Sequence, residues 1–226
     1  MSATIITPQL SLISTSHAPL YLWEEDHELT LIDCGIPKNL PALTNAITSL
    51  GHSITNLKTV ILTHFHVDHA GASAELANHG TTICASTTET PYITGDTPQP
   101  APNLEEWELP LWNSLPPEVL NASTPPSPIH KQLNDGDTVG PFRILTTPGH
   151  TPGSIAIYHP QQQILFTGDT VANVDNTPTR GVFNTHPELL TTSLKRLADL
   201  NITMICPGHG NIITQNPQHA LTELAQ

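Results

Sequence analysis

Short apolar runs alternate along the chain with polar or glycine-containing turns, and this pattern predicts a mixed α/β fold. Apolar or alternating runs predict strands at 4–13, 20–23, 28–33, 59–62, 81–85, 142–146, 154–159, 163–167 and 204–206. Longer runs predict helices at 39–50, 72–78 and 185–200. Thr185 and Glu188 have the spacing of a capping box that would start the last helix. Several predicted strands lead into a turn that carries His or Asp, so we expect these side chains to meet at one edge of a sheet.

The pattern changes between residues 86 and 132. Ten of the 22 prolines lie from Pro91 to Pro128, together with Trp107 and Trp112. Apolar residues around the tryptophans have helical spacing, with Pro110 interrupting it. We interpret 86–132 as an insertion that forms a lid or substrate wall within one domain spanning 1–226. A disordered proline-rich loop is the alternative.

Composition narrows the class of protein. The chain has 226 residues, enough for one sizeable core, and its formal charge of −13 would repel nucleic acid. No apolar run approaches a membrane span, and the first ten residues lack the features of a signal peptide. These features predict a cytoplasmic protein with a small-molecule substrate. They do not indicate the oligomeric state. The cysteines at 34, 84 and 206 are three in number and widely spaced, which favours buried small residues over disulfides or metal ligands.

Candidate chemistry is concentrated at residues 64–69, His-Phe-His-Val-Asp-His. This segment lies between a predicted strand and a predicted helix. Neutral imidazole and carboxylate oxygen are ligands of zinc and other first-row metals. His64 and His66 would face the same way on an extended segment, whereas Asp68 and His69 follow the turn. The spacing therefore favours two metals over one. The chain has 13 histidines, so a single His is weak evidence, but a cluster this dense would repel itself without a cation.

Four short motifs occur in order along the chain: the 64–69 segment, Gly-His at 149–150, Gly-Asp at 168–169 and Gly-His at 208–209. With Leu31-Ile32-Asp33-Cys34-Gly35 at the end of an early strand, this series resembles the metallo-β-lactamase superfamily from about residue 20 to 213. The resemblance implies a single-domain, four-layer αββα sandwich with metals at one edge of its two sheets.

The resemblance also implies a role for each motif residue. His64, His66 and His150 would bind one metal, Asp68, His69 and His209 the second, and Asp169 both. Asp33 and Thr63 would orient ligands. Two zinc ions are expected, with iron or manganese as alternatives. A hydroxide that bridges the metals would attack an acyl carbon, and Asp68 would act in catalysis by orienting it or by passing a proton to the leaving group.

We therefore predict a dinuclear hydrolase of a carboxylic ester, thioester or lactone. The alternative is an iron-dependent persulfide dioxygenase on the same fold. A β-lactamase is less favoured because zinc β-lactamases with this motif generally lack a bridging aspartate. A glyoxalase II-type thioesterase is less favoured because no Lys or Arg, which would bind glutathione, follows Arg196. The related lactonases have a catalytic tyrosine three residues after the bridging aspartate, and this position is Ala172 here. A non-enzymatic metal-binding protein is also less favoured, because such relatives usually lack some of the family's metal ligands and this chain has all of them.

Residues outside the motifs receive simpler interpretations. Trp107, Trp112 and Arg180 are candidates for the substrate pocket, with Arg180 available to a substrate carboxylate or carbonyl. The eight remaining histidines are expected to have structural or surface roles; they lie at 17, 27, 52, 79, 130, 159, 186 and 219.

Overall fold

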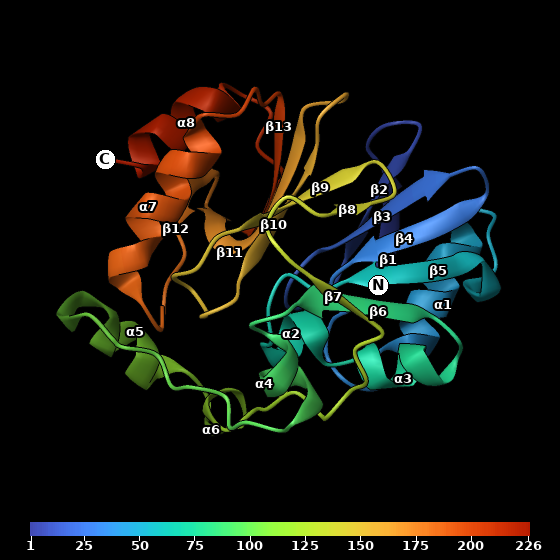
Figure 1. Cartoon of the computed structure of the whole chain (residues 1–226), viewed down its shortest axis with the longest axis horizontal. Coiled ribbons are helices and arrows are strands. Elements are labelled where there is room, and N and C mark those ends of the chain that lie inside the picture. The colour runs from blue at the N-terminus through green and yellow to red at the C-terminus, as the bar shows by residue number, and fades with distance from the viewer. The chain divides into compact units, whose positions relative to one another are not determined.

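The computed structural model describes residues 1–226 apart from the side chain of residue 118. The chain forms two compact units, each with one sheet and its own helices (Figure 1). Unit 1 consists of Met1–Pro98 and Ser123–Leu133, and unit 2 consists of Gln99–Ala122 and Asn134–Gln226. Each unit is a β layer with an α layer, the mixed α/β class that the sequence predicts.

The sheet of unit 1 has seven strands that follow one another in sequence order. They are β1 (Ser2–Ile5), β2 (Leu10–Ser14), β3 (Leu20–Glu25), β4 (Glu28–Ile32), β5 (Leu57–Ile61), β6 (Thr82–Ser86) and β7 (Lys131–Leu133). The first four strands pair antiparallel, and β4 to β7 pair in parallel. Ile32 is paired with Ile61. The next residues along β4 and β5 therefore leave the sheet at the same edge, and this edge carries the unit's candidate metal ligands.

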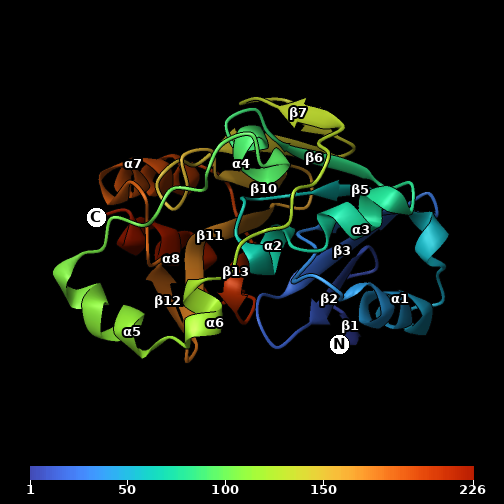
Figure 2. The ribbon, with the colours of Figure 1, turned by 90° about the horizontal axis from the view of Figure 1, so that it is seen from below.

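Helices cover one face of this sheet. They are α1 (Leu40–Ser49), α2 (Val67–Ala70), α3 (Ser73–Asn78) and α4 (Thr90–Thr94), with a 3-10 turn η1 (Ile54–Asn56). Figure 2 shows α1 and α3 beside each other against the strands. Leu43 and Ile47 of α1 and Leu76 of α3 are fully buried in one core with Leu31 and Val60 of the sheet. Removal of these apolar side chains from water holds the helix layer to the sheet.

The sheet of unit 2 has the order β12-β11-β10-β9-β8, and β13 also pairs with β11, in parallel. Its strands are β8 (Thr138–Val139), β9 (Phe142–Thr146), β10 (Ile155–His159), β11 (Ile164–Val174), β12 (Thr177–Arg180) and β13 (Met204–Gly210). Helices α7 (Pro187–Ala198) and α8 (Pro217–Leu224) lie beside each other in both views (Figures 1 and 2). Leu194 of α7 and Leu221 of α8 are buried in one core with Leu165 and Ile205 of the sheet.

Four local predictions need correction. The strand predicted at 4–13 is two strands, because Ile6 and Thr7 turn back and donate their N–H groups to the carbonyl of Leu10. The strands predicted at 163–167 and 204–206 continue to Val174 and Gly210, since they pair with each other through register shifts that a local pattern does not reveal. The capping box is also wrong: His186 occupies the N-cap position, and the Thr185 hydroxyl bonds to the carbonyls of Gly149 and His150 instead.

The segment 86–132 is divided between the units. Residues 99–122 belong to unit 2 and form η2 (Glu106–Glu108), α5 (Leu109–Ser114) and α6 (Pro117–Leu120), which we call the arm. The arm is attached to the loop after β12. Glu108, only 1% exposed, accepts the Phe183 N–H at 2.6 Å, and the Asn103 N–H donates to the Asn184 carbonyl at 2.8 Å. Among the described residues, no helix is long and apolar enough to cross a membrane.

Candidate metal centre

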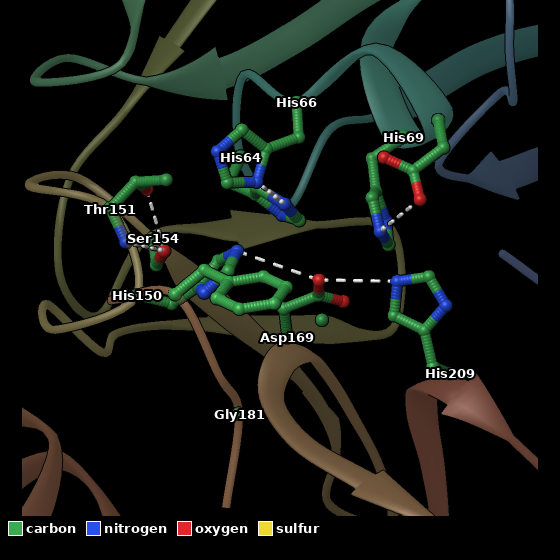
Figure 3. A network of polar contacts seen from close by, with 12 residues as sticks. His64, His66, His69, His150, Thr151, Ser154, Asp169, Gly181 and His209 are labelled. Carbon is green, nitrogen blue, oxygen red and sulfur yellow. Dashed lines mark hydrogen bonds and ion pairs between the residues drawn. The ribbon is translucent and has the colours of Figure 1, made fainter. Parts of the chain in front are cut away.

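In unit 1, His64 and His66 bring two ring nitrogens close together. His64 follows β5 and is fully buried, and His66 is the N-cap residue of α2 in extended conformation. His64 Nε2 lies 3.1 Å from His66 Nδ1 (Figure 3). Convergence of two imidazole nitrogens is expected where they share a cation.

Asp33 and Thr63 determine which nitrogens of the neighbouring rings carry protons. One oxygen of the buried Asp33 carboxylate accepts the Thr63 N–H at 2.8 Å, and the other accepts His69 Nδ1–H at 2.8 Å. The Thr63 hydroxyl also donates to Asp33 and lies 2.9 Å from His64 Nδ1. A hydroxyl has one proton, so His64 Nδ1–H donates to it. The Nε2 atoms of His64 and His69 therefore carry the lone pairs that a metal requires.

The backbone between His64 and His66 is held from both sides. Glu89, just before α4, is fully buried, and its carboxylate accepts the Phe65 N–H at 2.8 Å. The Thr124 hydroxyl donates to the Phe65 carbonyl. Sequence patterns did not indicate Glu89, because the 24 positions separating it from Phe65 exceed any local periodicity.

Asp68 and His69 project from the single turn of α2. Asp68 Oδ2 lies 3.7 Å from His69 Nε2, and the Asp68 side chain is 24% exposed while that of His69 is fully buried. Asp68 is thus the ligand candidate in unit 1 that combines a carboxylate with access from solvent, as a residue that handles a substrate proton requires.

In unit 2, Asp169 lies between two histidines. Asp169 Oδ2 is 3.4 Å from His150 Nε2 and 3.3 Å from His209 Nε2 (Figure 3). The Asp169 side chain is 12% exposed and that of His209 41%. One carboxylate oxygen facing two imidazole nitrogens is an arrangement suited to a carboxylate that contacts two metal ions.

Close backbone packing holds these side chains in place. Asp169 lies where the pairing of β11 with β13 shifts register, between Gly168 and Ala172. Gly208 of β13 packs so closely that a Cβ there would overlap Asp169 Oδ1. The absence of a side chain at 208 therefore lets the carboxylate lie beside β13, next to His209.

His150 lies in a turn between β9 and β10 that is fastened to the start of α7. The Thr185 N–H donates to the His150 carbonyl at 3.0 Å, and the His186 N–H donates to the Gly149 carbonyl at 2.9 Å. Across the turn, the Thr151 N–H donates to Ser154 Oγ at 3.0 Å. The turn is therefore rigid, and the His150 ring has little freedom to leave Asp169.

The chemistry of these residues fits a metal centre. Unit 1 supplies His64, His66, Asp68 and His69, and unit 2 supplies His150, Asp169 and His209, all of them nitrogen or oxygen donors. Hydrogen bonds from Nδ1 fix the ring orientation of His64 and His69, which is how proteins prepare histidines for a metal. Nitrogen and oxygen donors are compatible with zinc, iron and manganese.

Two of the three substrate-pocket candidates line one cavity. This cavity of unit 2 is about 390 Å³ and is bordered by Trp107 and Arg180. Trp112 is not among its lining residues, since its ring packs edge-on against Phe183 with centroids 5.0 Å apart. Arg180 also donates from Nε to the Leu224 carbonyl at 2.8 Å and from Nη1 to Thr191 Oγ1 at 3.1 Å.

Several residues outside the motifs have structural roles. All three cysteines are buried and free of disulfides, in agreement with the sequence interpretation. His130 Nδ1 accepts the Ile83 N–H at 3.1 Å, and the buried His159 accepts the Gln162 N–H at 3.1 Å. His79 lies at the C-cap of α3. Backbone hydrogen bonding thus accounts for His130 and His159.

Comparison with known proteins places this geometry in context. The profile of the metallo-beta-lactamase superfamily matches residues 18–209. A probable metallo-hydrolase, YflN of Bacillus subtilis, is 31% identical over 91% of this chain and 84% of its own length. The hydroxyacylglutathione hydrolase GloC of Haemophilus influenzae is 30% identical over 85% of each chain. A metallo-beta-lactamase family protein of Thermus thermophilus has a similar solved structure, with a TM-score of 0.73 and 26% identity over 98% of this chain and 79% of that one.

Proposed function

The chain belongs to the metallo-β-lactamase superfamily as a metallo-hydrolase, and we propose that it uses two metal ions to cleave a carboxylic ester, a thioester or a lactone. The profile match runs through both units, and the similarity to the Thermus structure covers nearly the whole chain, so the fold predicted from the sequence is confirmed. The metal count and the substrate class belong to the proposal.

The position of Asp169 carries the proposal. Its Oδ2 atom lies within 3.4 Å of His150 Nε2 and 3.3 Å of His209 Nε2. A carboxylate oxygen so close to two histidines, which belong to different metals in the family assignment, is the feature expected of a dinuclear site.

The ligand assignment of the family supplies the rest of the centre. In it, His64, His66 and His150 bind one ion, Asp68, His69 and His209 bind the other, and Asp169 contacts both. Two such ions would lower the pKa of a water nucleophile and polarise the acyl carbonyl. Asp33 and Thr63 hold the neutral ring tautomers that leave Nε2 of His64 and His69 available. Asp68, with 24% of its side chain exposed, orients the nucleophile or transfers the proton to the leaving group.

The relatives support the substrate class. One relative of 30% identity is named as a hydroxyacylglutathione hydrolase, and a hydroxyacylglutathione is a thioester. Esters, thioesters and lactones share an acyl carbon attached to an oxygen or sulfur leaving group, so one site geometry serves all three. Among these, the named relative makes thioesters the first substrates to assay.

Metal analysis combined with a substrate panel tests the proposal. Protein purified without chelator is expected to contain two metal ions per chain and to hydrolyse at least one member of a panel of esters, thioesters and lactones. Asp169→Asn is expected to lower kcat/KM by at least about 100-fold, because even residues that only orient metal ligands contribute about 10–100-fold. His219→Ala, which changes an exposed histidine outside the motifs, is the matched control and is expected to retain activity.

Three outcomes would contradict the proposal. Full activity of Asp169→Asn would remove the role of the shared carboxylate. Activity that survives removal of all metal by a chelator would exclude a metal-dependent mechanism. One iron per chain with persulfide-dependent oxygen uptake would instead favour a dioxygenase.

A further inference from the structure

The lining of the cavity of unit 2 contains none of the candidate metal ligands. The cavity has a volume of about 390 Å³, within the range of small-molecule sites. The arm, the loop after β12 and the first turns of α7 each contribute to its wall. The lining residues are Glu105, Trp107, Arg180, Gly181, Asn184, Pro187, Glu188, Leu190 and Thr191.

Asn184 lies in the wall of this cavity, where a hydrogen bond holds its side chain in place. Its side chain belongs to a residue only 3% exposed, and its Nδ2 donates to the Gly181 carbonyl at 2.8 Å. A carbonyl oxygen can only accept, so this bond fixes the amide orientation and makes Oδ1 the atom without a hydrogen-bond partner among the described residues. Oδ1 has essentially no accessible surface and is out of reach of a ligand in the cavity, so the role of the Asn184 amide is to hold the Gly181 segment of the wall in place.

Arg180 provides a fixed cation in the same wall. Its Nε and Nη1 atoms are engaged by the Leu224 carbonyl and the Thr191 hydroxyl, which hold the guanidinium in place. Nη2 makes no hydrogen bond to any described residue and is therefore the donor available to a ligand. A guanidinium with a free donor edge recognises a carboxylate.

The remaining lining favours a positive group in the same ligand. Glu105 and Glu188 are exposed carboxylates, so with Arg180 the lining has two negative groups and one positive group, a formal charge of −1. Trp107 is 61% exposed, and Glu105 accepts its indole N–H at 3.0 Å, which orients the ring. An indole face beside carboxylates attracts an ammonium group.

We propose that this cavity binds a small zwitterion of the α-amino acid type, with its ammonium beside Glu188 and the Trp107 indole and its carboxylate accepting from Arg180 Nη2. Pro187, Leu190 and the Trp107 ring offer apolar surface to an aliphatic side chain. An uncharged ligand would use neither the guanidinium nor the carboxylates of the lining. A simple anion would face the carboxylates of Glu105 and Glu188 without a positive group to offer them.

The site adjoins the backbone of two proposed metal ligands. Gly181 packs directly on the Asp169 carbonyl, and Thr185, next to Asn184, donates its N–H to the His150 carbonyl. Binding of the zwitterion nevertheless needs neither metal nor turnover, so its test is separate from that of the hydrolytic function.

Calorimetric titration of the full chain with L-leucine tests the proposal. Two further probes each lack one charge: L-leucinamide has no carboxylate, and N-acetyl-L-leucine has no ammonium. Saturable binding of L-leucine at one site per chain is expected, with each truncated probe at least about tenfold weaker. No saturable binding of L-leucine up to about 20 mM would overturn the proposal, since a weaker site would contribute little binding free energy.

Variants separate the cavity from the rest of the surface. Trp107→Ala and Glu188→Gln change exposed side chains of the lining, so both variants are expected to fold and to bind L-leucine at least about fivefold more weakly. Glu106→Gln removes the same charge from an exposed glutamate outside the lining and is expected to bind as the wild type does. Equal affinity in Trp107→Ala, Glu188→Gln and the wild type would contradict the assignment.

Discussion

The buried carboxylate of Glu89 accepts the backbone N–H of Phe65 at 2.8 Å, and Phe65 is the residue between His64 and His66. A fully buried carboxylate is costly unless it is hydrogen-bonded, so this contact stabilises one backbone conformation of the His-Phe-His segment. That conformation brings the His64 and His66 rings together. Glu89 is therefore a positioning residue for the candidate metal ligands of unit 1.

Glu89→Ala is expected to weaken metal binding. Removing the acceptor leaves the Phe65 N–H buried and unsatisfied, which costs about 1–3 kcal/mol of unfolding free energy. Glu89→Gln retains a carbonyl acceptor and is expected to recover most of the metal affinity. Competition with a coloured chelator measures affinity, and urea unfolding of the metal-free protein measures stability. Equal metal affinity of Glu89→Ala and Glu89→Gln would show that the contact does not position the ligands.

In Asp33→Asn, the proton of His69 is no longer expected to be fixed on Nδ1. The Asp33 carboxylate only accepts, so it keeps the proton on His69 Nδ1, whereas an asparagine can present its NH₂ group to the same nitrogen. Metal affinity is expected to fall about 10–100-fold, as for other residues that orient metal-binding histidines. Cobalt substitution, with its absorption spectrum as readout, would detect the altered ligand field. A spectrum identical to that of the wild type would count against this role.

Gly208→Ala tests the packing of β13 against Asp169. A Cβ at 208 would overlap Asp169 Oδ1 and approach the backbone of Gly168, so either the carboxylate or the strand has to move. The variant is expected to lose bound metal, measured by elemental analysis, even where circular dichroism shows a folded chain. Wild-type metal content in Gly208→Ala would mean that Asp169 does not need this close approach.

The Asp135–Arg196 ion pair predicts a pH dependence of stability. The hydrogen bond from Arg196, together with the Thr146 N–H, lowers the pKa of Asp135 from 3.8 to about 2. A carboxyl with a lowered folded-state pKa stabilises the fold above its unfolded pKa, and this contribution is lost as the pH falls from about 4 to about 2. Because the Asp135 side chain is 46% exposed, solvent screens the pair, and Asp135→Asn should cost less than about 1 kcal/mol at pH 7.

Urea unfolding of the wild type and Asp135→Asn at pH 7, 4 and 3 measures this difference, with exposed Asp199→Asn as the control. The two stabilities are expected to converge toward the acid end. A difference between wild type and Asp135→Asn that grows as the pH falls would contradict the assigned sign.

The three thiols are expected to be unreactive in the folded protein. Burial raises the pKa of Cys84 to about 11 and raises the pKa values of Cys34 and Cys206 well above their usual range. At pH 8 a thiol reagent that absorbs light on reaction should label none of them in the native chain and all three in urea, since only thiolates react. Rapid labelling of one cysteine in native protein would reveal local opening around it.

Much of this protein was predictable from short sequence patterns. The strands at 20–23, 142–146 and 154–159 and the helix at 39–50 agree with the structure to within about two residues, because alternation and helical spacing reflect which side chains are buried locally. The 64–69 segment and the Gly-His and Gly-Asp turns indicated the metal chemistry, since donor atoms and sharp turns are properties of the residues themselves.

The sequence by itself determined the fold class, the superfamily and the candidate ligands, whereas tertiary structure alone decided how their surroundings are built. The contact between Glu89 and Phe65, the attachment of Glu108 to Phe183 and the place of Asn184 in the cavity wall join segments far apart in the chain. Register shifts between β11 and β13 likewise set the position of Asp169. Such contacts depend on which segments the folded core brings together. Hydrophobic periodicity shows which face of a helix or strand is buried, but it does not show which other segment packs against that face.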